Sequence, residues 1–259
     1  MQQTTVQQTT VQQTTVPPFN ERRAAAVITG ASSGVGSALA LRFAESVERV
    51  ILIGRDAERL QATARAVEQR GARSQCHVAE LDSVPSVDAL SSELGRLAAV
   101  SALIHAAGEF SAESVAALDP ADFDRILRVN LRAPYVLTRA LLPALQQGQG
   151  DVVFINSSVV GQRRAGLAAY GGSKAGLVAL ADSVRQECNP LGLRVLSVFL
   201  GATATPMQRN IHEQQARAYQ PEALLQPENV AQIVHAALAL PRGAEVTDLH
   251  LRPAVAHRP

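Results

Sequence analysis

Short apolar runs alternate with amphipathic stretches along most of this chain of 259 residues. AAAVITG at 24–30 and VILIG at 50–54 are typical of buried strands, and the apolar residues of GSALALRFAESV between them have helical spacing. The same pattern predicts strands at 73–81, 100–108, 151–158, 193–200 and 245–251, and helices near 56–70, 84–97, 120–147, 166–188 and 228–240. Repeated β-α-β order predicts an α/β fold, a doubly wound parallel sheet with helices on both faces.

The composition supports a covered parallel sheet. Apolar residues make up 47% of the chain and aromatic residues only 3%, so Ala, Val, Leu and Ile must fill the core. The net charge is +1 without a basic block, which argues against a nucleic-acid partner. No apolar run approaches a membrane span, and the N-terminus lacks a signal-peptide pattern. We therefore expect a soluble, cytoplasmic protein without a membrane partner, and two unpaired buried thiols at Cys76 and Cys188.

The first residues differ from the rest of the chain. QQTTV occurs three times between Gln2 and Val16, and Pro17-Pro18 follows. Such a repeat buries too little apolar surface to order itself, so we expect a disordered low-complexity tail at 1–20 and a single domain at 21–259. A partner-binding arm is the alternative, but the repeat offers no anchor residue.

A glycine-rich turn, TGASSGVG at 29–36, joins the first strand to the first helix. Its spacing is T-G-x-x-x-G-x-G rather than the common G-x-G-x-x-G. Such a turn lets the pyrophosphate of a dinucleotide approach the backbone at the positive end of the helix. Glycines also occur in ordinary turns between a strand and a helix, so the motif alone does not establish a nucleotide site.

The second strand is followed by Arg55, where dinucleotide folds that prefer NAD usually carry an acid. An arginine at this point can pair with the 2′-phosphate of NADP(H). Asp56 is better interpreted as the N-cap of the next helix. NADP(H) is thus favoured over NAD(H), the alternative being that Arg55 is only a solvated surface residue.

Lys174 is the only lysine of the chain and lies four residues after Tyr170. On a helix this spacing puts both side chains on one face. An adjacent ammonium is expected to stabilise the phenolate and lower the pKa of the tyrosine, which makes it a better acid or base near neutral pH. An isolated pair of this kind would usually be a surface pair.

The pair is not isolated, because other polar residues are expected at the same edge of the sheet. Ser157 ends the predicted strand 151–158, where its hydroxyl reaches the same edge of the sheet, and Asn130 lies on the long predicted helix. Ser158 is the alternative serine: counting from Tyr170 favours Ser157, whereas the local string SVVG favours Ser158.

With these motifs in this order, residues 24–252 resemble the short-chain dehydrogenase/reductase family, whose single-domain members carry TGxxxGxG and YxxxK motifs on a Rossmann-like sheet. The resemblance implies that Tyr170 exchanges a proton with the substrate and that Ser157 hydrogen-bonds the same oxygen. It also implies that Lys174 binds the nicotinamide ribose and Asn130 holds a relay water. The hydride itself comes from the cofactor.

The resemblance extends to further cofactor contacts, with two departures from the family pattern. HAAG at 105–108 stands where the family often has Asn-Asn-Ala-Gly, and His105 is interpreted as structural; Leu200 replaces a proline before the loop with Gly201. Residues 206–226 correspond to the substrate lid. The residues implied in cofactor binding are Gly30, Ser32, Ser33, Gly34, Val35, Gly36, Arg55, Asp82, Ala106, Ala107, Gly108, Asn130, Tyr170, Lys174, Gly201, Thr203 and Thr205.

Together these features predict an NADP(H)-dependent oxidoreductase that transfers hydride between nicotinamide and a small organic ketone or secondary alcohol. The alternative is a dinucleotide-binding sensor or assembly protein that keeps the fold without turnover. The other histidines have no ligand spacing, so no catalytic metal is expected. The resemblance also implies a homodimer or homotetramer joined through the helices near 130–147 and 168–188.

Overall fold

The computed structural model describes residues 23–162 and 164–254. The expected tail at 1–20 lies outside these residues. A seven-stranded parallel sheet with the order β3-β2-β1-β4-β5-β6-β7 forms the centre of the molecule. Its strands are β1 (Arg23–Thr29), β2 (Val47–Gly54), β3 (Arg73–Val78), β4 (Ala102–His105), β5 (Asp151–Ser157), β6 (Arg194–Leu200) and β7 (Asp248–Leu251).

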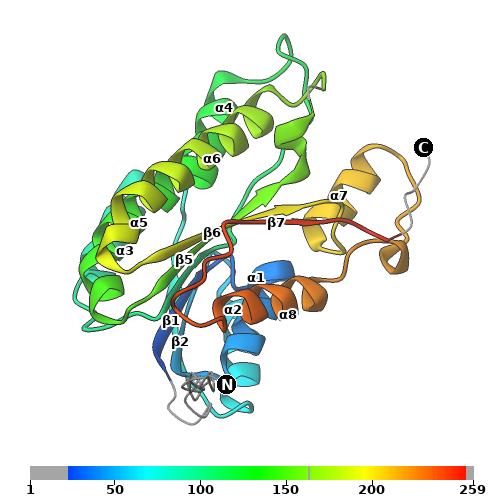
Figure 1. The fold of residues 1–259 in the computed structure, drawn as a ribbon. Helices are drawn as coiled ribbons and strands as arrows, with labels where there is room; N and C mark the ends of the chain where they lie inside the picture. Colours follow the sequence, from blue (N-terminus) through cyan, green and yellow to red (C-terminus); the bar gives the residue numbers. More distant parts are fainter. Residues whose placement is uncertain (1–22, 163, 255–259) are drawn as a thin grey trace, which may run out of the picture.

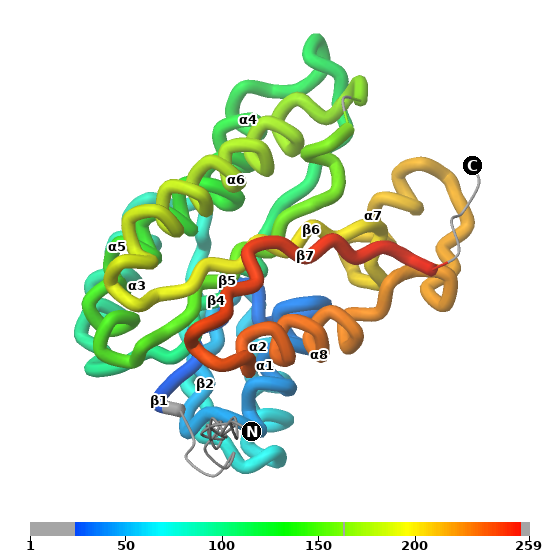
Figure 2. The backbone as a smooth tube through the Cα atoms, viewed as in Figure 1, coloured from blue at the N-terminus to red at the C-terminus, as the bar shows by residue number. Residues whose placement is uncertain are grey.

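Helices cover both faces of this sheet (Figure 1). On one face lie α1 (Gly34–Phe43), α2 (Ala57–Glu68) and α8 (Pro227–Leu238), and on the other lie α3 (Val84–Leu94), α5 (Ala133–Gln147) and α6 (Ala168–Cys188). The tube view shows α4 (Pro120–Leu127) alongside the first part of α6 (Figure 2). The predicted doubly wound α/β fold is confirmed.

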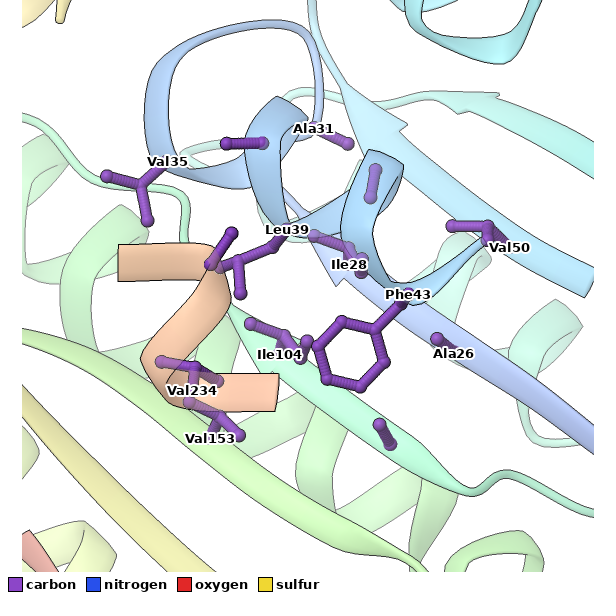
Figure 3. Close-up of a cluster of buried hydrophobic side chains, with 14 of the residues drawn as sticks. Ala26, Ile28, Ala31, Val35, Leu39, Phe43, Val50, Ile104, Val153 and Val234 are labelled. Atoms are coloured by element: carbon purple, nitrogen blue, oxygen red, sulfur yellow. The ribbon is translucent and has the colours of Figure 1, made fainter. Parts of the chain in front are cut away.

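Successive residues of each strand supply the two halves of the core. In β1, Ala26 and Ile28 pack toward α1 and α8, whereas Ala25 and Val27 face the opposite helices. Figure 3 shows the first cluster, where Leu39 and Phe43 of α1 meet Val234 of α8 over the strands. The side chains are almost all aliphatic, as the composition predicts for strands buried on both faces.

Two regions differ from the prediction. The predicted helix 120–147 is interrupted by a π-helical turn, η1 (Arg128–Arg132), that separates α4 from α5 and contains Asn130. Such turns are rare inside α-helices and occur frequently at functional sites. The stretch at 206–226, expected only as a lid, contains α7 (Pro206–Gln214), which Thr205 caps by accepting a hydrogen bond from the Gln208 backbone N–H. The N-cap expected at Asp56 is confirmed in the same way, with Arg59 as donor.

The order of the strands places the functional crevice. The chain leaves β1 toward β2 and β3 on one side, and returns to β4, β5 and β6 on the other. The switch point is therefore between β1 and β4, and ligands of such sheets bind outside the carboxyl ends of the strands at this point. Among the described residues, no helix has both the length and the apolar character needed to cross a membrane.

Candidate active site

The glycine-rich turn after β1 is packed too closely for side chains at two of its glycines. Gly30 has a φ of +68°, and a Cβ there would lie 2.7 Å from the Ala107 backbone nitrogen. A Cβ at Gly36 would lie 2.2 Å from the Gly30 carbonyl oxygen. Both glycines are thus required because neighbouring backbone atoms lie too close to allow a Cβ. Without side chains at these two positions, the backbone of the turn stays accessible at the switch point.

The first turn of α1 has no side-chain cap for its backbone N–H groups. Ser33 is the N-cap, but its side chain makes no capping hydrogen bond, and no acidic residue occupies the first turn. Ser32, Ser33 and Gly34 are half-buried, and Val35 and Gly36 are buried. A helix start with these features suits the pyrophosphate of a dinucleotide.

The loop after β4 is held against the turn by Thr29, the first residue of the glycine-rich motif, whose role the sequence did not predict. Its Oγ1 accepts hydrogen bonds from the Ala106 and Ala107 backbone nitrogens, at 3.1 and 3.2 Å. Nearby, His105 is buried with its Nε2 2.8 Å from Thr138 Oγ1, and burial lowers its pKa to about 3. His105 is therefore neutral near pH 7 and packs as a structural residue at the strand end.

Tyr170 and Lys174 lie on the first turns of α6, and their side chains face the ends of β4 and β5. Lys174 is only 5% exposed, its Nζ donates a 2.9 Å hydrogen bond to the Ile155 carbonyl, and the same atom lies 6.0 Å from the centre of the Tyr170 ring. Phe110 packs edge-on against that ring at 4.9 Å. The single lysine is thus a buried residue of the crevice and not a surface cation.

The pKa shifts of this pair correct one expectation. Burial raises the pKa of Tyr170, and a hydrogen bond with the Ser157 side chain opposes the increase without cancelling it. Burial also lowers the pKa of Lys174 to about 8. The pKa of Tyr170 is therefore raised rather than lowered as expected, because desolvation of the phenol is the largest influence on it.

The two candidate serines differ in their surroundings. Ser157 ends β5, is half-buried and is the hydrogen-bonding partner of Tyr170, while its Oγ also accepts a bond from the Val159 backbone nitrogen. Ser158 is the first residue of the next turn and is exposed. The structure thus brings Ser157, and not Ser158, to the tyrosine.

Asn130 connects three parts of the site. Its side chain is buried in the π-helical turn, where Oδ1 accepts from the Glu109 backbone nitrogen at 2.8 Å and Nδ2 donates to the Glu109 carbonyl at 2.9 Å. Nδ2 also donates to Ser173 Oγ at 3.0 Å, and Ser173 in turn donates to the Tyr170 carbonyl. Asn130 therefore fixes the loop after β4 to the first turn of α6.

Two further residues of the site escaped the sequence analysis. Asn156, buried at the end of β5, donates to the Lys174 carbonyl at 3.2 Å and accepts from the Ser157 backbone nitrogen. It sets the position of β5 relative to α6. Ser173 lies inside the Y-x-x-x-K motif and has no exposed surface. Both are small polar residues, within the predicted strand 151–158 and the Y-x-x-x-K motif, but their spacing carries no signal of its own.

Gly108 lies between Lys174 of α6 and Met207 of α7. A Cβ there would lie 3.5 Å from Asn130 Oδ1, 3.9 Å from Lys174 Nζ and 3.9 Å from the Met207 methyl group of the lid. Any longer side chain would fill the space between the lysine and the lid. The absence of a side chain thus keeps room for a ligand beside Lys174.

The remaining predicted residues surround this centre in different ways. Thr203 donates to the Gly201 carbonyl and Thr205 donates to the Thr203 carbonyl, so both hydroxyls shape the loop after β6. A Cβ at Gly34 would lie 2.9 Å from the Thr205 methyl group, which brings this loop against the glycine-rich turn. The pKa of Arg125 is raised mainly by a hydrogen bond with Asp122, and also by the charges of Glu109 and of the half-buried Asp82. In the described part of the chain, no cluster of His, Cys, Asp or Glu could hold a metal ion.

Comparison with known proteins identifies the family. The profile of the short chain dehydrogenase family matches residues 24–216, so the chain belongs to this family. An uncharacterized short-chain type dehydrogenase/reductase of Sinorhizobium fredii is 30% identical over 91% of this chain and 93% of its own. A 3-oxoacyl acyl-carrier-protein reductase of Rickettsia prowazekii is 30% identical over 74% of this chain and 78% of its own.

A solved structure agrees with these sequence matches. The alcohol dehydrogenase of the archaeon Thermococcus sibiricus, complexed with 5-hydroxy-NADP, is 27% identical and superposes with a TM-score of 0.80 over 91% of this chain and 98% of its own. The expected family and fold are both confirmed, and the chain is a member of an oxidoreductase family.

The buried lysine predicts an unusual dependence of stability on pH. Between the folded pKa of about 8 and the ordinary value of 10.5, the unfolded chain holds a proton that the folded chain has released, so the free energy of unfolding rises with pH. Lys174→Met carries no such proton. Between pH 7 and pH 10 the free energy of unfolding of the parent should therefore rise by about 2 kcal/mol relative to that of Lys174→Met. Urea denaturation of both proteins at these pH values measures the difference, and a constant difference would contradict the buried charge.

Proposed function

We propose that this protein is an NADP(H)-dependent oxidoreductase that transfers hydride between the nicotinamide and a small organic ketone or secondary alcohol. The observation that carries the proposal is the meeting of Tyr170, Ser157 and Lys174 at the carboxyl ends of β4 and β5, next to the switch point of the sheet. The bound cofactor supplies the hydride chemistry. An alcohol dehydrogenase with an NADP derivative and a reductase of a 3-oxo group are among the relatives, which supports this class of substrate.

The protonation states favour Tyr170 as a proton donor. Its raised pKa keeps the phenol protonated near neutral pH, as reduction of a carbonyl requires, and Ser157 lies beside it to hydrogen-bond the same oxygen. A lysine ammonium has three donors, and the Ile155 carbonyl takes one of them. The other two donors of Lys174 remain for the ribose hydroxyls. The side chain of Asn130 is hydrogen-bonded to Glu109 and Ser173, so we propose that it supports a relay water indirectly.

Substitution of the tyrosine tests the chemistry. Tyr170→Phe should lose at least two orders of magnitude in turnover of an accepted ketone, because the proton donor is removed, while NADPH binding is retained. Ser157→Ala should also lose turnover, and Ser158→Ala serves as its matched control with nearly parental activity. A ketone panel followed at the nicotinamide absorbance gives these rates. Unchanged turnover in Tyr170→Phe would instead support the binding-only alternative, a sensor or assembly protein.

Arg55 is proposed to select the cofactor. Its side chain follows β2 and is 75% exposed, so it can reach a 2′-phosphate on an adenine ribose. Asp82 after β3 is proposed to contact the adenine. Arg55→Ala should weaken NADPH binding by about 1.5–3 kcal/mol and leave NADH binding nearly unchanged, because only NADPH carries the phosphate. Binding titrations with both cofactors measure this, and an equal loss for both would refute the assignment.

We further propose a homodimer or homotetramer. A groove of about 450 Å³ runs beside η1, with an apolar floor from Leu127, Leu131, Tyr135 and Leu180 and charged residues Asp124, Arg128 and Arg132 in its lining. Tyr135 is half exposed there, and Gly176 lets Leu131 approach α6 closely. A second copy of the chain would cover this apolar surface.

The groove gives a test of assembly. Tyr135→Glu should lower the sedimenting mass of the protein to that of a monomer, because a carboxylate would be buried at the contact. Leu191→Glu, at a similarly exposed leucine outside the groove, should keep the mass of the parent. A parent protein that sediments as a monomer at micromolar concentration would rule the assembly out.

A further inference from the structure

An ion pair joins the loops that follow β2 and β4, on either side of β1 and its glycine-rich turn. The Arg55 Nη1 donates to Glu109 Oε1 at 2.9 Å, although the two residues are 54 positions apart in the sequence. Arg55 follows β2 and Glu109 follows β4, and β1 lies between these two strands. The pair therefore spans the switch point from one side to the other.

The packing of the turn places this pair over the dinucleotide crevice. Below Arg55, the Ala31 backbone nitrogen donates to the Ile53 carbonyl, and a Cβ at Gly54 would lie 3.2 Å from Ser32 Oγ. On the other side, Gly30 abuts Ala107. The turn that would hold the pyrophosphate thus lies between the two loops from which Arg55 and Glu109 reach each other.

Glu109 is held firmly, whereas Arg55 is not. The Glu109 side chain is 12% exposed, its other oxygen accepts from Arg125 of α4, and its backbone is fixed at both polar atoms by Asn130. The Arg55 side chain is 75% exposed and pairs with the Glu109 carboxylate. When a competing anion enters, Arg55 is the member that can move.

We propose that Glu109 determines cofactor specificity by competing with the 2′-phosphate of NADP(H) for Arg55. This inference rests on the proposed binding of that phosphate by Arg55. In the free protein the carboxylate holds the guanidinium across the crevice, and a cofactor with a 2′-phosphate takes the guanidinium from it. Arg125 stays on Glu109 and compensates the carboxylate after the exchange, so no buried charge is left unpaired. A cofactor without the phosphate does not compete for the guanidinium and leaves the pair in place.

The competition has a measurable sign. Glu109→Gln keeps the shape of the side chain and its backbone contacts but weakens the hold on Arg55. Because an exposed ion pair is worth up to about 1 kcal/mol, NADPH and 2′,5′-ADP should bind about three- to fivefold more tightly, and NADH and 5′-AMP should bind as to the parent. Glu113→Gln removes an exposed carboxylate four residues along and is the matched control, with unchanged dissociation constants for all four ligands.

A double-mutant cycle separates this proposal from the cofactor assignment. Dissociation constants for the four ligands are measured by calorimetry for the parent, Arg55→Ala, Glu109→Gln and the double variant, with thermal melting as the check on folding. The gain from Glu109→Gln should vanish when Arg55 is absent. If it persists there, or if Glu109→Gln does not tighten NADPH while Arg55→Ala weakens it, the competition is refuted and the role of Arg55 stands. If Arg55→Ala leaves NADPH binding unchanged, the cofactor assignment fails, and the competition fails with it.

Discussion

A buried network of hydrogen bonds between α6 and the carboxyl ends of β4 and β5 determines the geometry of the site. Lys174 donates to the carbonyl of Ile155, and Asn156 returns a bond to the carbonyl of Lys174. Asn130 closes the network by joining Ser173 of α6 to the loop after β4. Because these groups are buried, a polar atom that lost its partner could not hydrogen-bond to water instead. This cost favours a single arrangement of the side chains in the network.

The same network couples the two ends of the crevice. Asn130 binds the backbone of Glu109, and the carboxylate of Glu109 meets Arg55 above the glycine-rich turn. One residue at the π-helical turn thus supports the first turn of α6, which carries the tyrosine, and also the loop that faces the proposed cofactor. A π-helical turn suits this task, since it changes the direction in which the helix presents a side chain without ending the helix.

The sequence could predict what depends on local pattern. The strands follow from apolar runs and the cap at Asp56 from short-range chemistry, and the structure has all of them. The interruption at 128–132 was missed, because propensity does not distinguish a π-helical turn from the α-helix around it. Thr29 and Glu109 were missed since their partners are distant in sequence, and the pKa of Tyr170 was misjudged since it depends on burial, which spacing does not report.

The use of one lysine in a chain whose other basic residues are arginine follows from the cost of burial. Lys174 has almost no exposure, and desolvation lowers its pKa to about 8, so it can lose its charge at modest cost. An arginine could not, because its guanidinium stays protonated, and its five donors would need partners where the structure offers the Ile155 carbonyl. Arginine is suited instead to position 55, where water and the Glu109 carboxylate satisfy its donors. The choice between the two cations is therefore set by depth in the protein as much as by the ligand that each one is proposed to bind.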